Sequence, residues 1–264
     1  MKKISHESPL CLLEKSREYN DYDYCLVHLL DQYPEYYRFF SESLKYEREV
    51  VLDNSIFELG VAFNSERFAK WIQRLHPTYY IIPDVLENMK KTVDQFQDWI
   101  KRYSYLPGKK IGVVQGKSLD EIVYCYQAIE PQCDKVAISF DYSFYRELFP
   151  HSNEIVSWSM GRVLMINRLL SLGVINTEKP HHLLGCASPN EFIFYRDSIY
   201  DFIDSIDTSN PIVHGILGVK YPQYGLWEKK RIKLVDLLSH NVTNQERELI
   251  EYNIKWFKEI VNGN

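Results

Sequence analysis

The chain has 264 residues, of which 45% are hydrophobic and 25% are charged, a composition typical of ordinary soluble globular proteins with one large domain. Its 36 acidic and 31 basic residues give a net charge of −5, so the chain as a whole lacks the basic balance of a typical nucleic-acid-binding protein, although cations can still gather on one face. No apolar run approaches the length of a membrane span, and residues 1–7 lack the apolar core of a signal peptide. The five cysteines are scattered and include no Cys-x-x-Cys pair, which favours reduced thiols in a cytoplasm and predicts no structural zinc site.

Seven segments have the length and the apolar content of short buried strands. In chain order, the predicted strands are residues 23–30, 49–55, 78–84, 110–116, 135–139, 182–185 and 203–207. Residues 1–20 show no clear period, and the aromatic segment 140–145 follows the fifth strand. Residues 211–219 are a candidate for an eighth strand, although no helix separates them from the seventh.

Helical patterns with start and stop signals separate most of these strands. In chain order, the predicted helices are residues 34–48, 65–75 and 90–105, one that opens at Ser118 with capping-box spacing, 153–172 and 189–202. Residues 226–260 are predicted to form two amphipathic helices.

Strands that alternate with helices, with no linker or composition break, predict a parallel sheet within one domain. Seven clear units and a candidate eighth favour a (β/α)8 TIM-type barrel, of the α/β class, over an open doubly wound sheet. We therefore expect a single barrel domain over residues 1–264. In this prediction, residues 1–20 form an N-terminal extension and residues 226–264 add C-terminal helices.

Polar side chains recur at the carboxyl ends of the predicted strands. Asp53, Asp84, Gln115 and Asp207 each fall at or just past the end of an apolar run. Any one of them alone is more often a cap or a salt-bridge partner. Four at matching positions predict a polar pocket on the face where such barrels carry out catalysis, with carboxylates that suit nucleophilic or acid/base chemistry.

The motifs that contain these residues resemble those of a known family. Residues 52–58, Leu-Asp-Asn-Ser-Ile-Phe-Glu, resemble Asp-Ser-Gly-Gly-Phe-Gln, and residues 112–116, Gly-Val-Val-Gln-Gly, resemble Gly-Ile-Val-Gln-Gly. Residues 184–191, Leu-Gly-Cys-Ala-Ser-Pro-Asn-Glu, resemble Met-Gly-Val-Gly-Thr-Pro-Glu-Asp, and residues 204–211 keep the spacing of Asp-Met-Phe-Asp-Cys-x-x-Pro. These are motifs of the tRNA-guanine transglycosylases and of their phage relatives that put 7-deazaguanines into DNA.

The resemblance implies a role for each matching residue. Asp207 would be the nucleophile and Asp53 the general acid/base, while Asp84 and Gln115 would read the edge of the bound base. Gly185 would let backbone approach the pocket closely. The remaining substrate-binding candidates lie in the same motifs and are Gly116, Asn54, Ser55 and Phe57.

The chain also departs from the family pattern. The Gly-Gly of the fifth strand is Ser139-Phe140, and Ile212-Val213 stand where the family has an Arg after the catalytic motif. The family's Cys-x-Cys-x-x-Cys…His zinc site, which helps to grip tRNA, is missing. A short chain without this site is more similar to the phage DNA-modifying branch, which would place it in a host cytoplasm.

The implied reaction is base exchange through a covalent glycosyl-enzyme, with guanine flipped out of DNA and a 7-deazaguanine as co-substrate. It needs no metal or redox cofactor and no membrane. The candidate phosphate contacts are Arg162, Arg168, Lys220, Lys229, Lys230 and Arg231, although each taken singly is more often part of a solvated helix face. The histidines at 28, 181, 182 and 214 are interpreted as structural hydrogen-bonding groups, with His214 the one to test.

Three other functions remain open at this point. The enzyme could exchange bases in tRNA rather than DNA. The chain could be a catalytically silent subunit that binds nucleic acid, although the pair Asp53 and Asp207 argues against this. It could also be a barrel hydrolase of small glycosides, which needs two carboxylates at a suitable separation.

Overall fold

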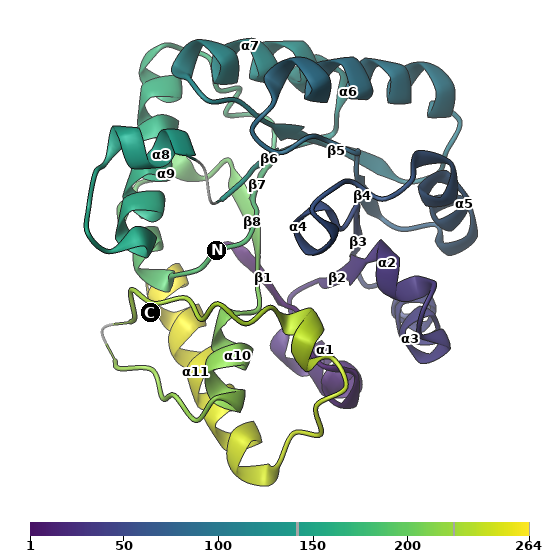
Figure 1. Cartoon of the computed structure of the whole chain (residues 1–264), viewed down its shortest axis with the longest axis vertical. Helices are drawn as coiled ribbons and strands as arrows, with labels where there is room; N and C mark the ends of the chain where they lie inside the picture. Colours follow the sequence, from purple (N-terminus) through teal and green to yellow (C-terminus); the bar gives the residue numbers. More distant parts are fainter. Residues whose placement is uncertain (141–142, 224, 264) are drawn as a thin grey trace.

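Eight parallel strands form a nearly closed barrel with helices around it (Figure 1). The structure is a computed structural model and describes residues 1–140, 143–223 and 225–263. Asp141 and Tyr142 of the predicted aromatic segment, Tyr224, and Asn264 at the end of the predicted C-terminal helices lie outside the described residues. The strands are β1 (Lys3–His6), β2 (Asp23–Leu26), β3 (Val50–Asp53), β4 (Tyr79–Ile81), β5 (Lys109–Val114), β6 (Lys135–Ile138), β7 (His181–Leu183) and β8 (Ile203–Thr208).

Helices connect the strands and cover the outside of the barrel (Figure 1). The α-helices are α1 (Leu13–Tyr19), α2 (Val27–Leu30), α3 (Pro34–Lys45), α4 (Ile56–Leu59), α5 (Ser65–Leu75), α6 (Met89–Tyr103), α7 (Leu119–Ile129), α8 (Ser143–Leu148), α9 (Glu154–Ser171), α10 (Asn210–Ile216) and α11 (Asn244–Asn262). Short 3-10 helices are η1 (Leu10–Leu12), η2 (Glu130–Gln132), η3 (Pro189–Tyr195), η4 (Ser198–Tyr200) and η5 (Leu234–Leu237). The predicted (β/α)8 TIM-type barrel is therefore confirmed.

The ladder runs in the order β1-β8-β7-β6-β5-β4-β3-β2, so the barrel has a seam between β1 and β2. Two residues that precede β2 bridge this seam. The Asp21 N–H donates to the Ile4 carbonyl at 2.9 Å, and the Ile4 N–H donates to the Asp21 carboxylate at 2.9 Å. The His6 N–H donates to Asn20 Oδ1 at 2.7 Å, and Asn20 Nδ2 donates to the His6 carbonyl at 3.0 Å. Side-chain amide and carboxylate groups thus replace a ladder at the seam.

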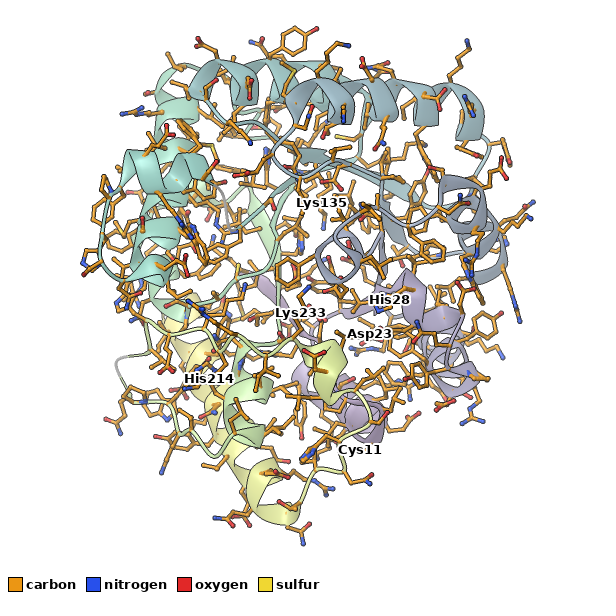
Figure 2. All side chains as sticks on the ribbon, in the orientation of Figure 1. Cys11, Asp23, His28, Lys135, His214 and Lys233 are labelled. Carbon is orange, nitrogen blue, oxygen red and sulfur yellow. The ribbon has the colours of Figure 1, made fainter. Side chains whose placement is uncertain are left out.

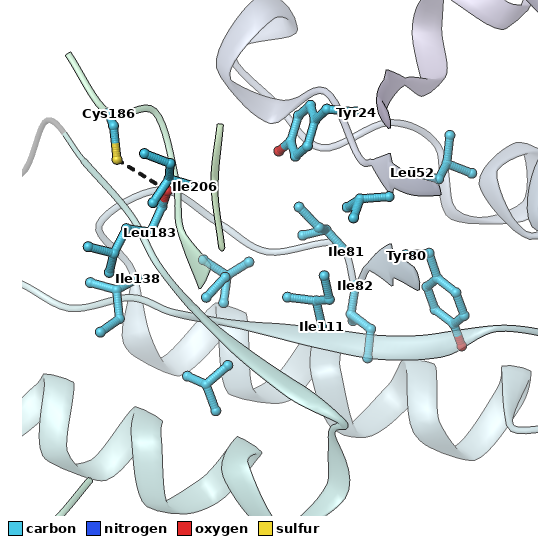
Figure 3. Packing of buried hydrophobic residues seen from close by; sticks show 14 of the residues in the cluster. Tyr24, Leu52, Tyr80, Ile81, Ile82, Ile111, Ile138, Leu183, Cys186 and Ile206 are labelled. Carbon is cyan, nitrogen blue, oxygen red and sulfur yellow. Dashed lines mark hydrogen bonds between the residues drawn. The ribbon is translucent and has the colours of Figure 1, made fainter. Parts of the chain in front are cut away.

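Apolar side chains from successive strands fill the core. Ile81, Ile111, Ile138, Leu183 and Ile206 come from β4 to β8, and each is at most 1% exposed (Figure 3). Burial of one such side chain contributes roughly 1.5–3 kcal/mol relative to leaving it in water. The parallel sheet is stable because both of its faces are covered in this way.

The eighth strand differs from the prediction. It is β1, within the segment predicted to be an extension without periodicity, and it pairs with β8. Residues 211–219 do not form a strand, because Pro211 opens α10 and Ile212 and Val213 pack on Ile250 of α11. Their β-branched side chains have high strand propensity, but helix packing overrides it.

Three other predicted elements are also corrected. Residues 27–30 turn into α2 directly after β2, and a run buried on all sides does not distinguish a strand from a helical turn by its periodicity. Residues 189–202 form η3 and η4 instead of one helix, since Asp197 accepts a hydrogen bond from Ile199 N and starts a new turn. Residues 226–233 form no helix or strand and lead through η5 to the single long helix α11, where two helices were expected.

Candidate active site

A cavity of about 780 Å³ lies at the carboxyl ends of the strands. Its lining includes Glu7 after β1, Asp53 at the end of β3, Asp84 after β4, Gly185 after β7 and Asp207 in β8. The volume falls within the usual range of small-molecule sites, and the position is that of the active sites of α/β barrels. The structure therefore brings together the three carboxylates that the sequence analysis singled out.

Asp207 is 4% exposed, and one of its oxygens accepts two hydrogen bonds. The Gly185 N–H donates to Oδ1 at 3.1 Å, and His182 Nε2 lies 3.0 Å from the same oxygen. Gly185 has a φ of +60°, which glycine adopts without steric cost. Within the part of the chain that the structure describes, Oδ2 of Asp207 has no hydrogen-bond partner.

His182 is 1% exposed and connects Asp207 to the barrel interior. Its Nδ1 lies 3.0 Å from Ser205 Oγ, and its ring stacks on Tyr24 with centroids 6.0 Å apart. Ser205 Oγ in turn lies 3.1 Å from Lys135 Nζ, which forms an ion pair with Asp204 at 2.6 Å. Figure 2 shows Lys135 within the ring of strands.

Asp53 is the second carboxylate of the predicted catalytic pair. It accepts a hydrogen bond from Ser55 N at 2.9 Å, and Ser55 holds a left-handed φ of +59°. Burial, followed by the charge of Glu58, raises the pKa of Asp53 well above its usual range, and the Ser55 N–H opposes this only in part. The raised pKa favours the protonated form of the Asp53 carboxyl group, the form that a general acid needs.

Two further carboxyl groups belong to the same cluster. Burial and the charge of Glu58 raise the pKa of Glu7 well above normal, and Asp207 and Asp53 add to the effect. Burial also raises the pKa of Glu58. Carboxyl groups this close cannot all be ionised, so protons are shared among them.

Two side-chain amides donate hydrogen bonds to the carboxylate of Asp84. Asn54 Nδ2 donates to its Oδ1 at 2.8 Å, and Gln115 Nε2 donates to its Oδ2 at 2.6 Å. Burial raises the pKa of Asp84 to about 6 in spite of these bonds. Gln115 does not line the cavity and its Oε1 accepts from Glu87 N at 2.7 Å, so it positions Asp84 and Glu87 and does not contact a ligand in the cavity.

Aromatic side chains form part of the cavity wall. Phe140 and Trp158 meet edge to face with centroids 5.7 Å apart, and Trp227 packs on the same cluster. Phe57 is 45% exposed at the rim. Faces of this kind can stack on a flat heterocycle, as in proteins that hold unpaired bases.

Residues 226–233, which we call the basic strap, run across the barrel mouth (Figure 1). Side chains of the barrel hold its backbone, because Ser188 Oγ, Asn153 Nδ2 and Asn210 Nδ2 donate to three of its carbonyls at 2.8, 3.0 and 2.9 Å. At the other end of the basic strap, Lys233 (labelled in Figure 2) donates a hydrogen bond from Nζ to the Phe57 carbonyl at 2.9 Å. The cations of the basic strap are Lys229, Lys230, Arg231 and Lys233, and all four line the cavity.

Some predicted residues lie elsewhere. Ser55 is buried, and its Oγ accepts from His28 N at 3.4 Å. Gly116 packs against α7, where an added Cβ would lie 2.9 Å from the Glu121 Cβ. Neither lines the cavity. Ser55 and Gly116 instead support the backbone next to Asp53 and Gln115.

Three of the predicted phosphate contacts are also corrected. Arg162 is 0% exposed and paired with Glu191, so it cannot reach a nucleic acid. Arg168 lies 14 residues after Glu154 on α9, about 21 Å along the helix from the cavity rim. Lys220 lies over the Tyr252 ring, outside the cavity lining.

The histidine interpretation changes for His182 and for His28, whose two ring nitrogens are buried without a hydrogen-bond partner among the described residues. His181 bonds Tyr126 and the Lys179 carbonyl and is structural, as expected, whereas His182 contacts the proposed nucleophile. His214 lines the cavity and bonds the Asn210 carbonyl at 2.9 Å, and burial lowers its pKa. The sequence analysis missed His182, together with the cavity carboxyl group of Glu7. Alternation along β7 could have suggested that one of the two adjacent histidines points inward.

The described ranges contain no group of three or more His, Cys, Asp or Glu side chains arranged to hold a metal ion. No helix in the described part of the chain is long and apolar enough to cross a membrane. No family model matches the chain, and no curated protein is detectably similar to it.

Proposed function

We propose that the protein is a base-exchange glycosyltransferase that replaces guanine in DNA with a 7-deazaguanine. The observation that carries the proposal is the pair of buried carboxyl groups in one cavity. Asp207 accepts two hydrogen bonds on Oδ1, which leaves Oδ2 without a hydrogen-bond partner among the described residues, whereas burial and neighbouring charge raise the pKa of Asp53. A carboxylate and a carboxylic acid that face the same space supply a nucleophile and a general acid.

In the first half-reaction, Asp207 Oδ2 attacks C1′ of the deoxyribose and the C1′–N9 bond to guanine breaks. The electron pair of that bond leaves with the guanine, which takes a proton from Asp53. In the second half-reaction, the incoming 7-deazaguanine gives its N9 proton to the Asp53 carboxylate, and N9 attacks C1′. The bond between C1′ and Oδ2 breaks, so both carboxyl groups return to their starting states.

The rest of the cavity suits this substrate. Asp84 can accept hydrogen bonds from the N–H groups of a guanine-like edge, and its two amide neighbours fix its orientation. Phe140 and Trp158 offer aromatic surface to the ring. The cations of the basic strap line the cavity and could bind the phosphates beside a flipped nucleotide.

Mass spectrometry of nucleosides tests the proposal. DNA is incubated with the protein and a panel of 7-deazaguanine bases, digested, and searched for the deazaguanine nucleoside. Incorporation into DNA supports the proposal. Incorporation into a tRNA transcript but not into DNA would replace it with exchange on tRNA.

A hydrolase of small glycosides is the second candidate, and the cavity carboxyl groups of Glu7 and Glu58 favour it. Such an enzyme would use water in place of the incoming base. It would release free base from nucleosides without DNA and without any incorporation. The same mass spectra separate the two functions.

A further inference from the structure

A chain of hydrogen bonds leads from the amino end of the barrel to Asp207, and its direction can be read from the chemistry of its members. Lys135 Nζ pairs with Asp204 at 2.6 Å, and an ammonium group only donates. Ser205 Oγ, at 3.1 Å from Nζ, therefore accepts from Lys135 and keeps its own hydrogen for another acceptor. His182 Nδ1 lies 3.0 Å from Oγ and is such an acceptor.

The other ring nitrogen of His182 must then carry the proton. Nε2 lies 3.0 Å from Oδ1 of Asp207, an oxygen that also accepts from Gly185 N. A carboxylate only accepts, so Nε2 donates. The neutral ring protonated on Nε2 is the form that satisfies both contacts.

Two alternatives are less favourable. A doubly protonated His182 would direct a second cation at Ser205 Oγ, which already accepts from the Lys135 ammonium. The Ser205 hydroxyl could instead donate to the Asp204 carboxylate, but Asp204 is already neutralised by Lys135, and His182 Nδ1 would then have no hydrogen to accept. The barrel interior offers little solvent to compensate, since Lys135, His182 and Ser205 are each 1% exposed.

The geometry points to His182 as a positioning residue for the proposed nucleophile, with Ser205 and Lys135 holding it in the form protonated on Nε2. His182 and Gly185 then fix Oδ1 of Asp207, and Oδ2 is the oxygen presented to the sugar carbon. The hydrogen-bond chain itself stands on the geometry, whereas its catalytic role rests on the proposed function. The ring stack on Tyr24 limits rotation of the imidazole.

The tautomer can be measured without any substrate. Nitrogen-15 NMR distinguishes protonated from unprotonated ring nitrogens, and the signals of His182 among the eight histidines are those absent from a His182→Phe spectrum. We expect the wild type at neutral pH to carry the proton on Nε2 alone. A proton on Nδ1 alone, or on both nitrogens, would overturn the inference.

Variants of Ser205 test what holds the tautomer. Ser205→Ala should spread the proton over both nitrogens and lower kcat for base exchange about 10- to 100-fold with little change in KM, as is usual when the group that orients a functional histidine is lost. Ser205→Thr keeps the hydroxyl and should restore the tautomer. Unchanged tautomer and kcat in Ser205→Ala would overturn the inference.

A matched control comes from the neighbouring strand. Ser5 is paired in register with Asp207, it is fully buried, and its hydroxyl has no hydrogen-bond partner among the described residues. Ser5→Ala should leave the His182 tautomer and the exchange rate unchanged. Wild-type protein with the Nε2 proton but no base exchange would support the hydrogen-bond chain and overturn the proposed function. Protein that exchanges bases but carries the His182 proton on Nδ1 would support the proposed function and overturn the hydrogen-bond chain.

Discussion

Replacement of Arg162 by leucine should destabilise the fold strongly. Its guanidinium is fully buried, and all five of its N–H groups have acceptors. Nε and Nη2 donate to the two carboxylate oxygens of Glu191 at 2.8 Å each, and Nη2 also reaches Cys186 Sγ at 3.4 Å. Nη1 donates to the carbonyls of Ser139 and Leu184 at 3.3 and 2.8 Å.

The expected cost of Arg162→Leu is about 3–5 kcal/mol, because Glu191 is left as a fully buried charge without its counter-charge. This is a large part of the about 5–15 kcal/mol that stabilises a typical domain. With a urea m-value of about 3 kcal/mol/M, the unfolding midpoint should fall by about 1 to 1.7 M. Ser139 and Leu184 line the cavity, so the variant should also lose substrate affinity.

Urea unfolding followed by circular dichroism measures the change. Arg168→Leu is the matched control, since Arg168 is an exposed arginine on the same helix and its loss should cost no more than about 0.5 kcal/mol. The double variant Arg162→Leu/Glu191→Leu should regain at least about 1–2 kcal/mol, because no charge remains buried alone. A cost below about 1 kcal/mol for the single variant, or a double variant less stable than the single one, would refute this reasoning.

Three further predictions concern the cavity. Asp207→Asn should keep the fold but lower base exchange by several orders of magnitude, whereas Asp53→Asn should accumulate a covalent adduct, and a denaturing gel with labelled DNA distinguishes the two. Burial raises the pKa of Asp84 from 3.8 to about 6, so the folded state binds the Asp84 proton more tightly than the unfolded state. This stabilises the folded state fully below pH 3.8, and the stabilisation is lost as the pH rises through about 6. The stability of the wild type relative to Asp84→Asn should therefore fall over this range by up to about 3 kcal/mol, measured by urea unfolding at each pH. Lys230→Gln/Arg231→Gln should lower the slope of log Kobs against log salt for DNA binding by about 2, if each side chain contacts one phosphate.

Each of these three has an outcome that contradicts it. Near wild-type exchange by Asp207→Asn would show that another carboxylate is the nucleophile. A stability difference for Asp84→Asn that does not change with pH would mean that folding does not shift the pKa of Asp84. Lys220→Gln, outside the cavity, should leave the salt slope unchanged, and an equal fall in this control would argue against binding through the basic strap.

Three of the carboxylates of the site could be predicted because each follows a short apolar run. Asp53, Asp84 and Asp207 occupy equivalent places in three β/α units, and the parallel topology of the units brings equivalent places together. The strand β1 could not be predicted in this way. Of the four residues of β1, only Ile4 is a large apolar residue. The segment is a strand because it forms backbone hydrogen bonds with β8, about 200 residues away.

Long-range partners also explain the errors at single residues. Arg162 looks like a surface cation until Glu191, 29 residues later, is placed beside it. The two adjacent histidines of β7 alternate in direction, and the local pattern does not say which of them faces the barrel interior. The basic strap lies in a segment that was predicted to form amphipathic helices, yet it forms no helix where the barrel's side chains bind its carbonyls.

The pairing of β1 with β8 has a consequence for biosynthesis. The ribosome makes β1 before β8, and the only ladder partner of β1 among the described residues is made about 200 residues later. At about 5–20 residues per second, β1 waits on the order of 10–40 s with its edge unpaired. The cavity is likewise incomplete until then, because Asp207 lies on β8. The nascent chain is therefore most exposed to aggregation late in translation, and a pause before residue 203 would lengthen that exposure.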